Sequence, residues 1–173
     1  MLPISSVDKN RQVQYLDLKE NNLLVPRLEQ SRNYIYSIDF SMLIYKITTP
    51  DPNIARIWDK DAAMEIVDYY KNYLWLLRKY SDIHPIIPPS LEIDEIWHHH
   101  ILDTYKYHDD CTAIFGQYLH HYPYYGMRGE DDYKDLQRTF AITQHLHYQE
   151  FGENIMSFEE ESAKIAPSGA WQT

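Results

Sequence analysis

The stretch from Asp59 to Tyr80, DKDAAMEIVDYYKNYLWLLRKY, decides the fold of this chain. Apolar side chains recur in it at positions i, i+3, i+4, i+7, i+11 and i+14, namely Ala63, Ile66, Val67, Tyr70, Leu74 and Leu77. An α-helix turns by about 100° per residue, so this spacing places all six on one face. The stretch therefore predicts a long helix that buries one face in a core.

A shorter helix is predicted before this stretch. Ser37 is a suitable N-cap, because its hydroxyl can accept a hydrogen bond from the first helical turn. The apolar residues that follow it lie on one face: Phe40, Leu43, Ile44 and Ile47. The sequence TTPDP at residues 48–52 ends this helix, since proline disfavours helical geometry in the residue before it. The first 30 residues and the tail after Ser157 are predicted to be irregular.

Two more helices are predicted after the central one. Ser90 follows two prolines and can cap a third helix, which runs through a histidine-rich stretch. A fourth helix is predicted from about Asp131 to Glu150, with Tyr133, Leu136, Phe140 and Phe151 on one stripe. Residues 116–130 contain both glycine and proline, so they are predicted to form a long loop rich in histidine and tyrosine.

The distribution of glycine supports an all-α fold. All five glycines lie at or after Gly116, which argues against a β-rich fold with tight glycine turns. No internal repeat or linker divides the chain, and 173 residues suit one domain. We therefore predict a single-domain helical bundle or orthogonal helical array over residues 1–173.

Composition excludes several classes of function. The formal net charge of -10 opposes binding to nucleic-acid phosphates and to anionic membranes. No apolar run approaches the roughly 18 residues that a membrane-spanning helix needs, and the N-terminus lacks the pattern of a signal peptide. The single cysteine, Cys111, cannot form an intramolecular disulfide, which favours a reducing, cytoplasmic location. The 16 tyrosines predict a core with many side-chain hydrogen bonds.

Chemistry is concentrated in the histidines, eight of which lie between His98 and His147. Residues 94–104 read DEIWHHHILDT. On one continuous helix, His100 lies on the buried face, next to Thr104. His98 follows Asp94 by one turn, and His99 points toward solvent.

Each of these positions has two interpretations. His100 is either a metal ligand or a core histidine that hydrogen-bonds a hydroxyl or carbonyl. Asp94 and His98 are either a ligand pair or a hydrogen bond on the helix surface. Cys111 is interpreted as a small buried side chain more readily than as a nucleophile. His145 and His147 are two residues apart, so at most one faces the core. The metal motif H-E-x-x-H is absent.

The pattern from Ile93 to Pro123 resembles the glycine-rich domain-containing protein-like family, which was long catalogued as a domain of unknown function. The matching positions are Trp97, His98, His100, Thr104, Tyr107, Asp110, Cys111, His120 and His121. The resemblance covers about residues 55–155. In plants the domain precedes longer proteins, and in bacteria and fungi it forms short chains, to which this sequence is similar. The family has no settled activity, so the resemblance implies a site at His98, His100 and the His120–His121 loop without naming its reaction.

These observations predict a site that binds a divalent metal. We expect the loop after Gly116 to fold back over the third helix, with His98 and His121 as ligands. Asp94 is either the third ligand or a carboxylate that orients a ligand histidine. Two histidines and a carboxylate suit Zn²⁺, Fe²⁺ or Mn²⁺. In a metal-dependent enzyme acting on a small or natural-product-type substrate, the catalytic residues are predicted to be His100, Tyr107 and His120.

The alternative is a non-catalytic module that binds a protein partner. In that case the histidines form a hydrogen-bonded structural network in the core. The partner would dock on the aromatic loop that contains Tyr122, Tyr124, Tyr125 and Met127, because tyrosine and methionine are enriched at interfaces. Metal content distinguishes the two hypotheses.

Overall fold

The computed structural model describes residues 25–50 and 56–156. Within these ranges the chain forms six α-helices and no strand, which confirms the all-α prediction. The helices are α1 (Leu28–Ser37), α2 (Ser41–Thr48), α3 (Lys60–Tyr80), α4 (Leu91–Leu102), α5 (Thr104–Phe115) and α6 (Glu130–Phe151). Between α5 and α6 the chain has neither helix nor strand, as predicted.

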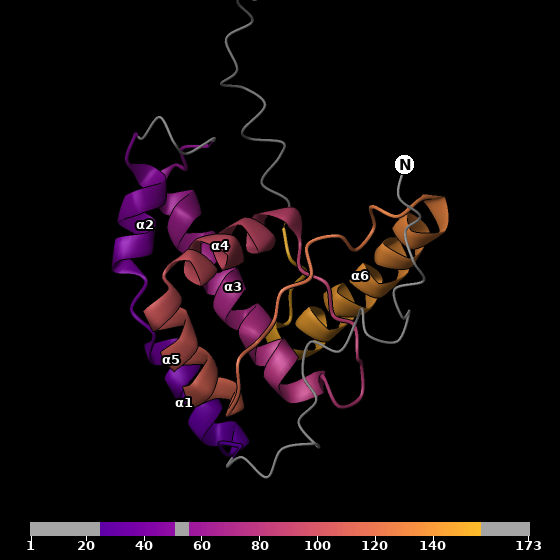
Figure 1. Ribbon diagram of the computed structural model, residues 1–173, viewed down its shortest axis with the longest axis horizontal. Helices are drawn as coiled ribbons and strands as arrows, with labels where there is room; N and C mark the ends of the chain where they lie inside the picture. The colour runs from indigo at the N-terminus through magenta and orange to yellow at the C-terminus, as the bar shows by residue number, and fades with distance from the viewer. Residues whose placement is uncertain (1–24, 51–55, 157–173) are drawn as a thin grey trace, which may run out of the picture.

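Helix α3 is the centre of the fold, and α1, α2, α4 and α6 all pack against it (Figure 1). It begins where the sequence predicted, because the Asp59 carboxylate caps it by accepting the backbone N–H groups of Asp61 and Ala62 at 2.9 and 3.3 Å. All six residues of its predicted apolar face are buried. The strongest periodic stretch of the sequence therefore organises the core.

Helix α1 was not expected, and Ser37 ends it instead of capping the next helix. Helix α2 begins after Phe40. Apolar and polar contacts both hold α1. Its Ile35 is fully buried in the core. The buried Arg78 guanidinium of α3 donates to the Ser31 hydroxyl at 3.2 Å and to the Ile114 carbonyl of α5 at 3.0 Å. Ser31 itself donates to that carbonyl at 2.8 Å. The buried residues of α1 are Ser31 and Ile35, so the helix has no long apolar stripe and hydrophobic periodicity did not reveal it.

The predicted third helix is two helices, α4 and α5, that meet at Asp103. The Asp103 backbone leaves helical geometry (φ -84°, ψ 74°), and its carboxylate accepts the Lys106 N–H, so it starts α5. Thr104 is exposed beyond this break and does not pair with His100. The continuous helical wheel was wrong here because no glycine or proline marks the change of direction.

Helix α6 packs against the C-terminal half of α3, where Glu150 contacts Trp75 and Tyr80, and in Figure 1 it lies on the other side of α3 from α1 and α5. It buries Thr143, Leu146 and His147, whereas His145 is exposed, as the spacing of the two histidines required. Tyr133, on the predicted apolar stripe, is exposed. No helix in the described parts of the chain is long and apolar enough to cross a membrane.

Buried tyrosines hydrogen-bond throughout the core, as their number predicted. The Tyr73 hydroxyl donates to the Ile87 carbonyl at 2.8 Å, and the Tyr107 hydroxyl donates to the Leu119 carbonyl at 2.6 Å. Both side chains are fully buried. These bonds fix the positions of the connections before α4 and after α5, because each hydroxyl would be left without a partner if its connection moved.

Candidate metal centre

The three consecutive histidines of α4 occupy three different environments. His98 is exposed, with half of its side chain accessible to solvent. His100 is buried, as predicted. His99 was expected to be exposed but is half-buried, and its Nδ1 is enclosed without a hydrogen-bond partner among the described residues. Burial lowers the pKa of His99, and the nearby Lys46 lowers it further.

The structure brings together Asp94, His98 and His121, the three predicted metal ligands. One potential ligand atom of each lies within 4.8 Å of the others. The His121 Nε2 is 2.7 Å from one oxygen of Asp94, and the His98 Nε2 is 3.7 Å from the other. The two imidazole rings also meet, with their centroids 4.6 Å apart. Asp94 and His98 share a face of α4, while His121 comes from the loop that follows α5.

Buried aromatic residues place His121 beside α4. The Tyr107 hydroxyl holds the Leu119 carbonyl and accepts a hydrogen bond from the Trp97 indole N–H at 2.9 Å. The Trp97 ring then packs edge-on against the His121 ring, with 4.5 Å between centroids. Leu119 is fully buried beneath the loop. The loop therefore folds back over α4, as predicted, and reaches His121 only two residues after this anchor.

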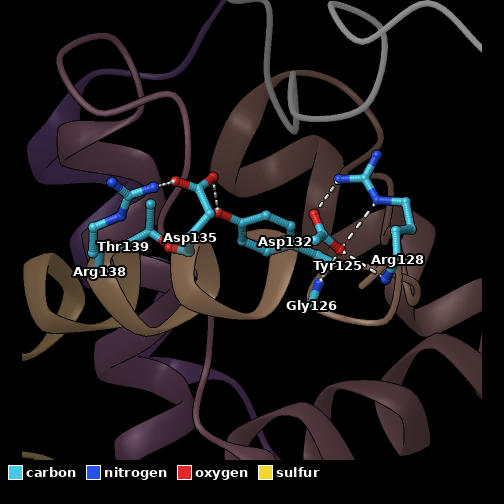
Figure 2. Close-up of polar contacts among 7 residues, drawn as sticks. All are labelled: Tyr125, Gly126, Arg128, Asp132, Asp135, Arg138 and Thr139. Atoms are coloured by element: carbon cyan, nitrogen blue, oxygen red, sulfur yellow. Dashed lines mark hydrogen bonds and ion pairs between the residues drawn. The ribbon is translucent and has the colours of Figure 1, made fainter. Parts of the chain in front are cut away.

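The other end of the loop is attached to the first turns of α6 (Figure 2). One oxygen of Asp132 accepts the Gly126 N–H at 2.7 Å, and Asp132 also pairs with Arg128. The Tyr125 hydroxyl donates to Asp135 at 2.9 Å. Gly126 has a positive φ of 88°, and a Cβ there would lie 2.5 Å from Leu136, so this turn requires glycine. With both ends attached, the His121 segment is held against the core.

His100 belongs to a second cluster, which is buried. Its Nδ1 is 2.9 Å from the Tyr70 hydroxyl, and its Nε2 is 2.9 Å from an oxygen of Asp110. The other Asp110 oxygen accepts the Tyr34 hydroxyl at 2.6 Å. Burial alone would raise the pKa of Asp110, but the hydrogen bonds from His100 and Tyr34 and the charge of Lys106 lower it overall. Asp110 is thus a carboxylate at neutral pH, and His100 donates to it through Nε2.

The sequence analysis missed the pairing of His100 with Asp110 and Tyr70. A straight helix would separate residues 100 and 110 by about 15 Å, so the pairing requires the bend at Asp103. Asp103 could have indicated this bend in the sequence, because aspartate is a preferred N-cap and often precedes a new helix.

The predicted catalytic residues do not form one cluster with the three candidate ligands. His120 is exposed and contacts the Tyr118 ring, with 4.9 Å between centroids. The rings of His100 and Tyr107 are 5.0 Å apart in the core. Their catalytic roles stay predictions. Cys111 is buried, and burial raises the pKa of its thiol to about 11, so it is protonated at neutral pH and poorly suited to act as a nucleophile.

Comparison with known proteins gives the family. The family model described as UCP032817-like matches residues 30–157, and the chain belongs to this family. The match includes α2 and most of α1, so it begins before the motif-bearing region. Glycine-rich domain-containing protein 1 of Arabidopsis thaliana is 27% identical over 119 residues, which are 65% of this chain but 13% of the plant protein. No solved structure matches the chain.

The donors of the open cluster fit a divalent cation. Imidazole and carboxylate both bind Zn²⁺, Fe²⁺ and Mn²⁺. Ligand atoms around such an ion lie about 3 Å apart when each bond is about 2 Å. The present separations, up to 4.8 Å, therefore need small side-chain rotations, which the exposed His98 can make.

Proposed function

We propose that this protein binds one divalent metal ion through Asp94, His98 and His121 and uses it as a metal-dependent enzyme on a small substrate. The observation that carries the proposal is the convergence of three potential ligand atoms from α4 and the following loop within 4.8 Å. Substrates of the natural-product type remain within this proposal, because the site does not define a substrate further.

A simple hydrogen bond does not account for the whole cluster. The Asp94–His121 contact, at 2.7 Å, would suffice to attach the loop to α4. His98 adds no short hydrogen bond to that attachment, since its Nε2 is 3.7 Å from Asp94 and half of its side chain is exposed. Its ring nevertheless lies edge-on against the His121 ring. A third ligand is the role that this arrangement supports.

Three protein ligands would leave positions on the ion open to water or substrate, as in catalytic metal sites. The bound ion would supply an activated water or bind O₂. Trp97 would orient His121 and exclude water from one side of it, because the two rings are in contact. His120 is exposed and adjacent to His121 in sequence, so it is the predicted residue best placed to exchange protons with solvent.

The test is metal content followed by calorimetric titration. Protein purified without a histidine tag is analysed for bound metals, and the apo-protein is titrated with Zn²⁺, Mn²⁺ and, without oxygen, Fe²⁺. We expect one ion per chain for at least one of them. His98→Ala and His121→Ala should each weaken binding by at least about 100-fold, because loss of one of three protein ligands removes a large part of the site.

His108→Ala is the matched control. His108 is also helical, exposed and next to an aspartate, with 3.4 Å between its Nδ1 and Asp109. Its removal should leave the affinity unchanged. Equal affinity in wild type, His98→Ala and His121→Ala would eliminate the proposed site.

The second candidate is a non-catalytic module for a protein partner. It is favoured by the buried cluster, in which both ring nitrogens of His100 already have partners. The exposed side chains of Tyr124 and Met127 would then contribute to the docking surface. Absence of stoichiometric metal after expression with added metals would favour this candidate over the enzyme.

A further inference from the structure

A separate cavity of about 560 Å³ lies between α2 and the junction of α4 with α5. None of the three candidate metal ligands lines it. Phe40 and Leu43 form part of its wall, and the largely exposed Met42, Tyr45 and Leu102 also line it. Its volume falls within the range of about 300–1,000 Å³ that is typical of small-molecule sites.

The charged groups around the cavity define the ligand that would complement it. Its carboxylates are already engaged: Asp39 accepts the Ser41 N–H at 2.8 Å, and Asp103 accepts the Lys106 N–H. The Lys106 ammonium pairs with Asp110 at 3.3 Å.

Lys46 is different from these three groups. Within residues 25–50 and 56–156, its ammonium has neither an ion pair nor a hydrogen bond, although it lines the cavity. An anionic group is the natural partner for it.

His99, in the same wall, is a second polar group without a partner among the described residues. Its ring lines the cavity, yet its Nδ1 is enclosed without a partner in the described parts of the chain. Buried polar atoms nearly always have a hydrogen-bond partner, so this one calls for an explanation. Rotation of the ring toward a ligand would satisfy it. Apolar walls, a lysine without an ion pair and an unsatisfied imidazole together describe a site for an amphipathic anion.

We propose that this cavity binds a small free carboxylic acid with an apolar tail. The carboxylate would pair with Lys46, and the tail would lie against Phe40, Leu43 and Leu102. This site is distinct from the proposed metal centre, and its test does not depend on metal binding.

Octanoate is the probe, and octanol is its uncharged counterpart. Calorimetric titration should give saturable binding of one octanoate per chain, with octanol binding more weakly. Lys46→Met should weaken octanoate binding by about five-fold, the effect expected for a partly exposed ion pair. Lys134→Met is the matched control, because Lys134 is another exposed helical lysine whose partner is the exposed Glu130. Absence of saturable binding would overturn the proposal, as would equal weakening by both lysine variants.

Methionine methyl signals locate the binding site. Met42 lines this cavity, Met156 lines a groove between α4 and α6, and Met127 lies in the loop before α6. In protein labelled with ¹³C at methionine methyl groups, octanoate should shift the Met42 signal in NMR spectra and leave Met127 and Met156 unchanged. Assignment uses Met→Leu variants. A shift of Met156 or Met127 without Met42 would place the ligand elsewhere and refute the proposal.

Discussion

The open cluster of Asp94, His98 and His121 and the buried cluster of His100 and Asp110 lie close together in sequence but differ in their spare capacity to bind. In the buried cluster, both His100 nitrogens and both Asp110 oxygens have protein partners. In the open cluster, Asp94 and His121 make a short contact, and His98 faces solvent.

This difference teaches that a dense group of histidines is not by itself a site. A metal or substrate needs lone pairs that the protein has not already used, and it needs a path from solvent. On the His100 ring no lone pair is free, because Nδ1 and Nε2 already have partners, so the buried cluster is best understood as a structural network. The open cluster has unused lone pairs and access to solvent, which is why we propose it as the metal site.

The largest expected effect comes from breaking the buried cluster. Asp110→Ala removes the partner of Tyr34, His100 and Lys106 at once. We expect a loss of about 3 kcal/mol or more in the free energy of unfolding, because buried polar groups are left unpaired. Urea unfolding measures it, and Asp109→Ala, at an adjacent exposed carboxylate, should change stability by less than about 0.5 kcal/mol. Similar losses in both variants would contradict the contrast between the clusters.

The next effect concerns the open cluster and should appear in metal affinity, with little change in stability. Asp94→Asn keeps the shape of the side chain but removes its charge. If Asp94 only orients His121, metal affinity should fall by about 10- to 100-fold. If it is a ligand, the defect should match that of His98→Ala. Calorimetric titration distinguishes these outcomes, and an Asn variant with wild-type affinity would remove Asp94 from the site.

A third carboxylate, that of Glu150, should make the free energy of unfolding depend on pH. Burial alone would raise the pKa of Glu150, but hydrogen bonds from Lys79, Tyr80 and Trp75 lower it from 4.5 to about 2. A depressed folded-state pKa contributes stability above the unfolded value that is lost as pH falls toward the folded one. Unfolding free energy should therefore decrease between pH 4.5 and 2.

Glu150→Gln is the variant that isolates this contribution. Because Lys79 is about one-third exposed, solvent screening reduces the contribution to on the order of 1–2 kcal/mol. The variant should be less stable than wild type at pH 7, and the gap should narrow at pH 3. A gap that stays constant with pH would show that Glu150 is not ionised in the way the structure implies.

The smallest expected effect is at His99. Its Nδ1 has no partner in the described parts of the chain, so His99→Ala removes an unsatisfied buried atom together with some packing. These changes oppose each other, and we expect a net change below about 1 kcal/mol in thermal or urea unfolding. His100→Ala should cost more, about 1–3 kcal/mol, since it leaves Tyr70 and Asp110 without their shared partner. Equal stability of the two variants would contradict the different environments of these neighbours.

The sequence was most informative where a local pattern, such as apolar periodicity or an N-cap residue, determines the structure. The apolar period of α3 gave its bounds almost to the residue, and Ser90 capped α4 as expected. Helix α1 escaped prediction because Ile35 is its one buried apolar residue, and the polar contacts of Ser31 with Arg78 and Ile114 have no periodicity. These contacts join residues tens of positions apart, which no local pattern records.

Within the candidate site, too, local patterns predicted the positions of some residues and not of others. Asp94 and His98 are one turn apart, so helical geometry alone brought them together. His121 needed the family resemblance and a loop prediction, and the structure explains its position by the Trp97 and Tyr107 contacts. The half-burial of His99 could not be predicted, because burial depends on tertiary packing that no local sequence pattern records.

His100 and Asp110 meet across the bend at Asp103, so the number of residues between them cannot change without breaking their contact. One inserted residue just after Thr104 would rotate the rest of α5 by about 100° and carry Asp110 and Tyr107 off their partners together. Insertions in this ten-residue segment should therefore break both buried contacts at once. Within the family, length variation is expected to spare the α4–α5 junction.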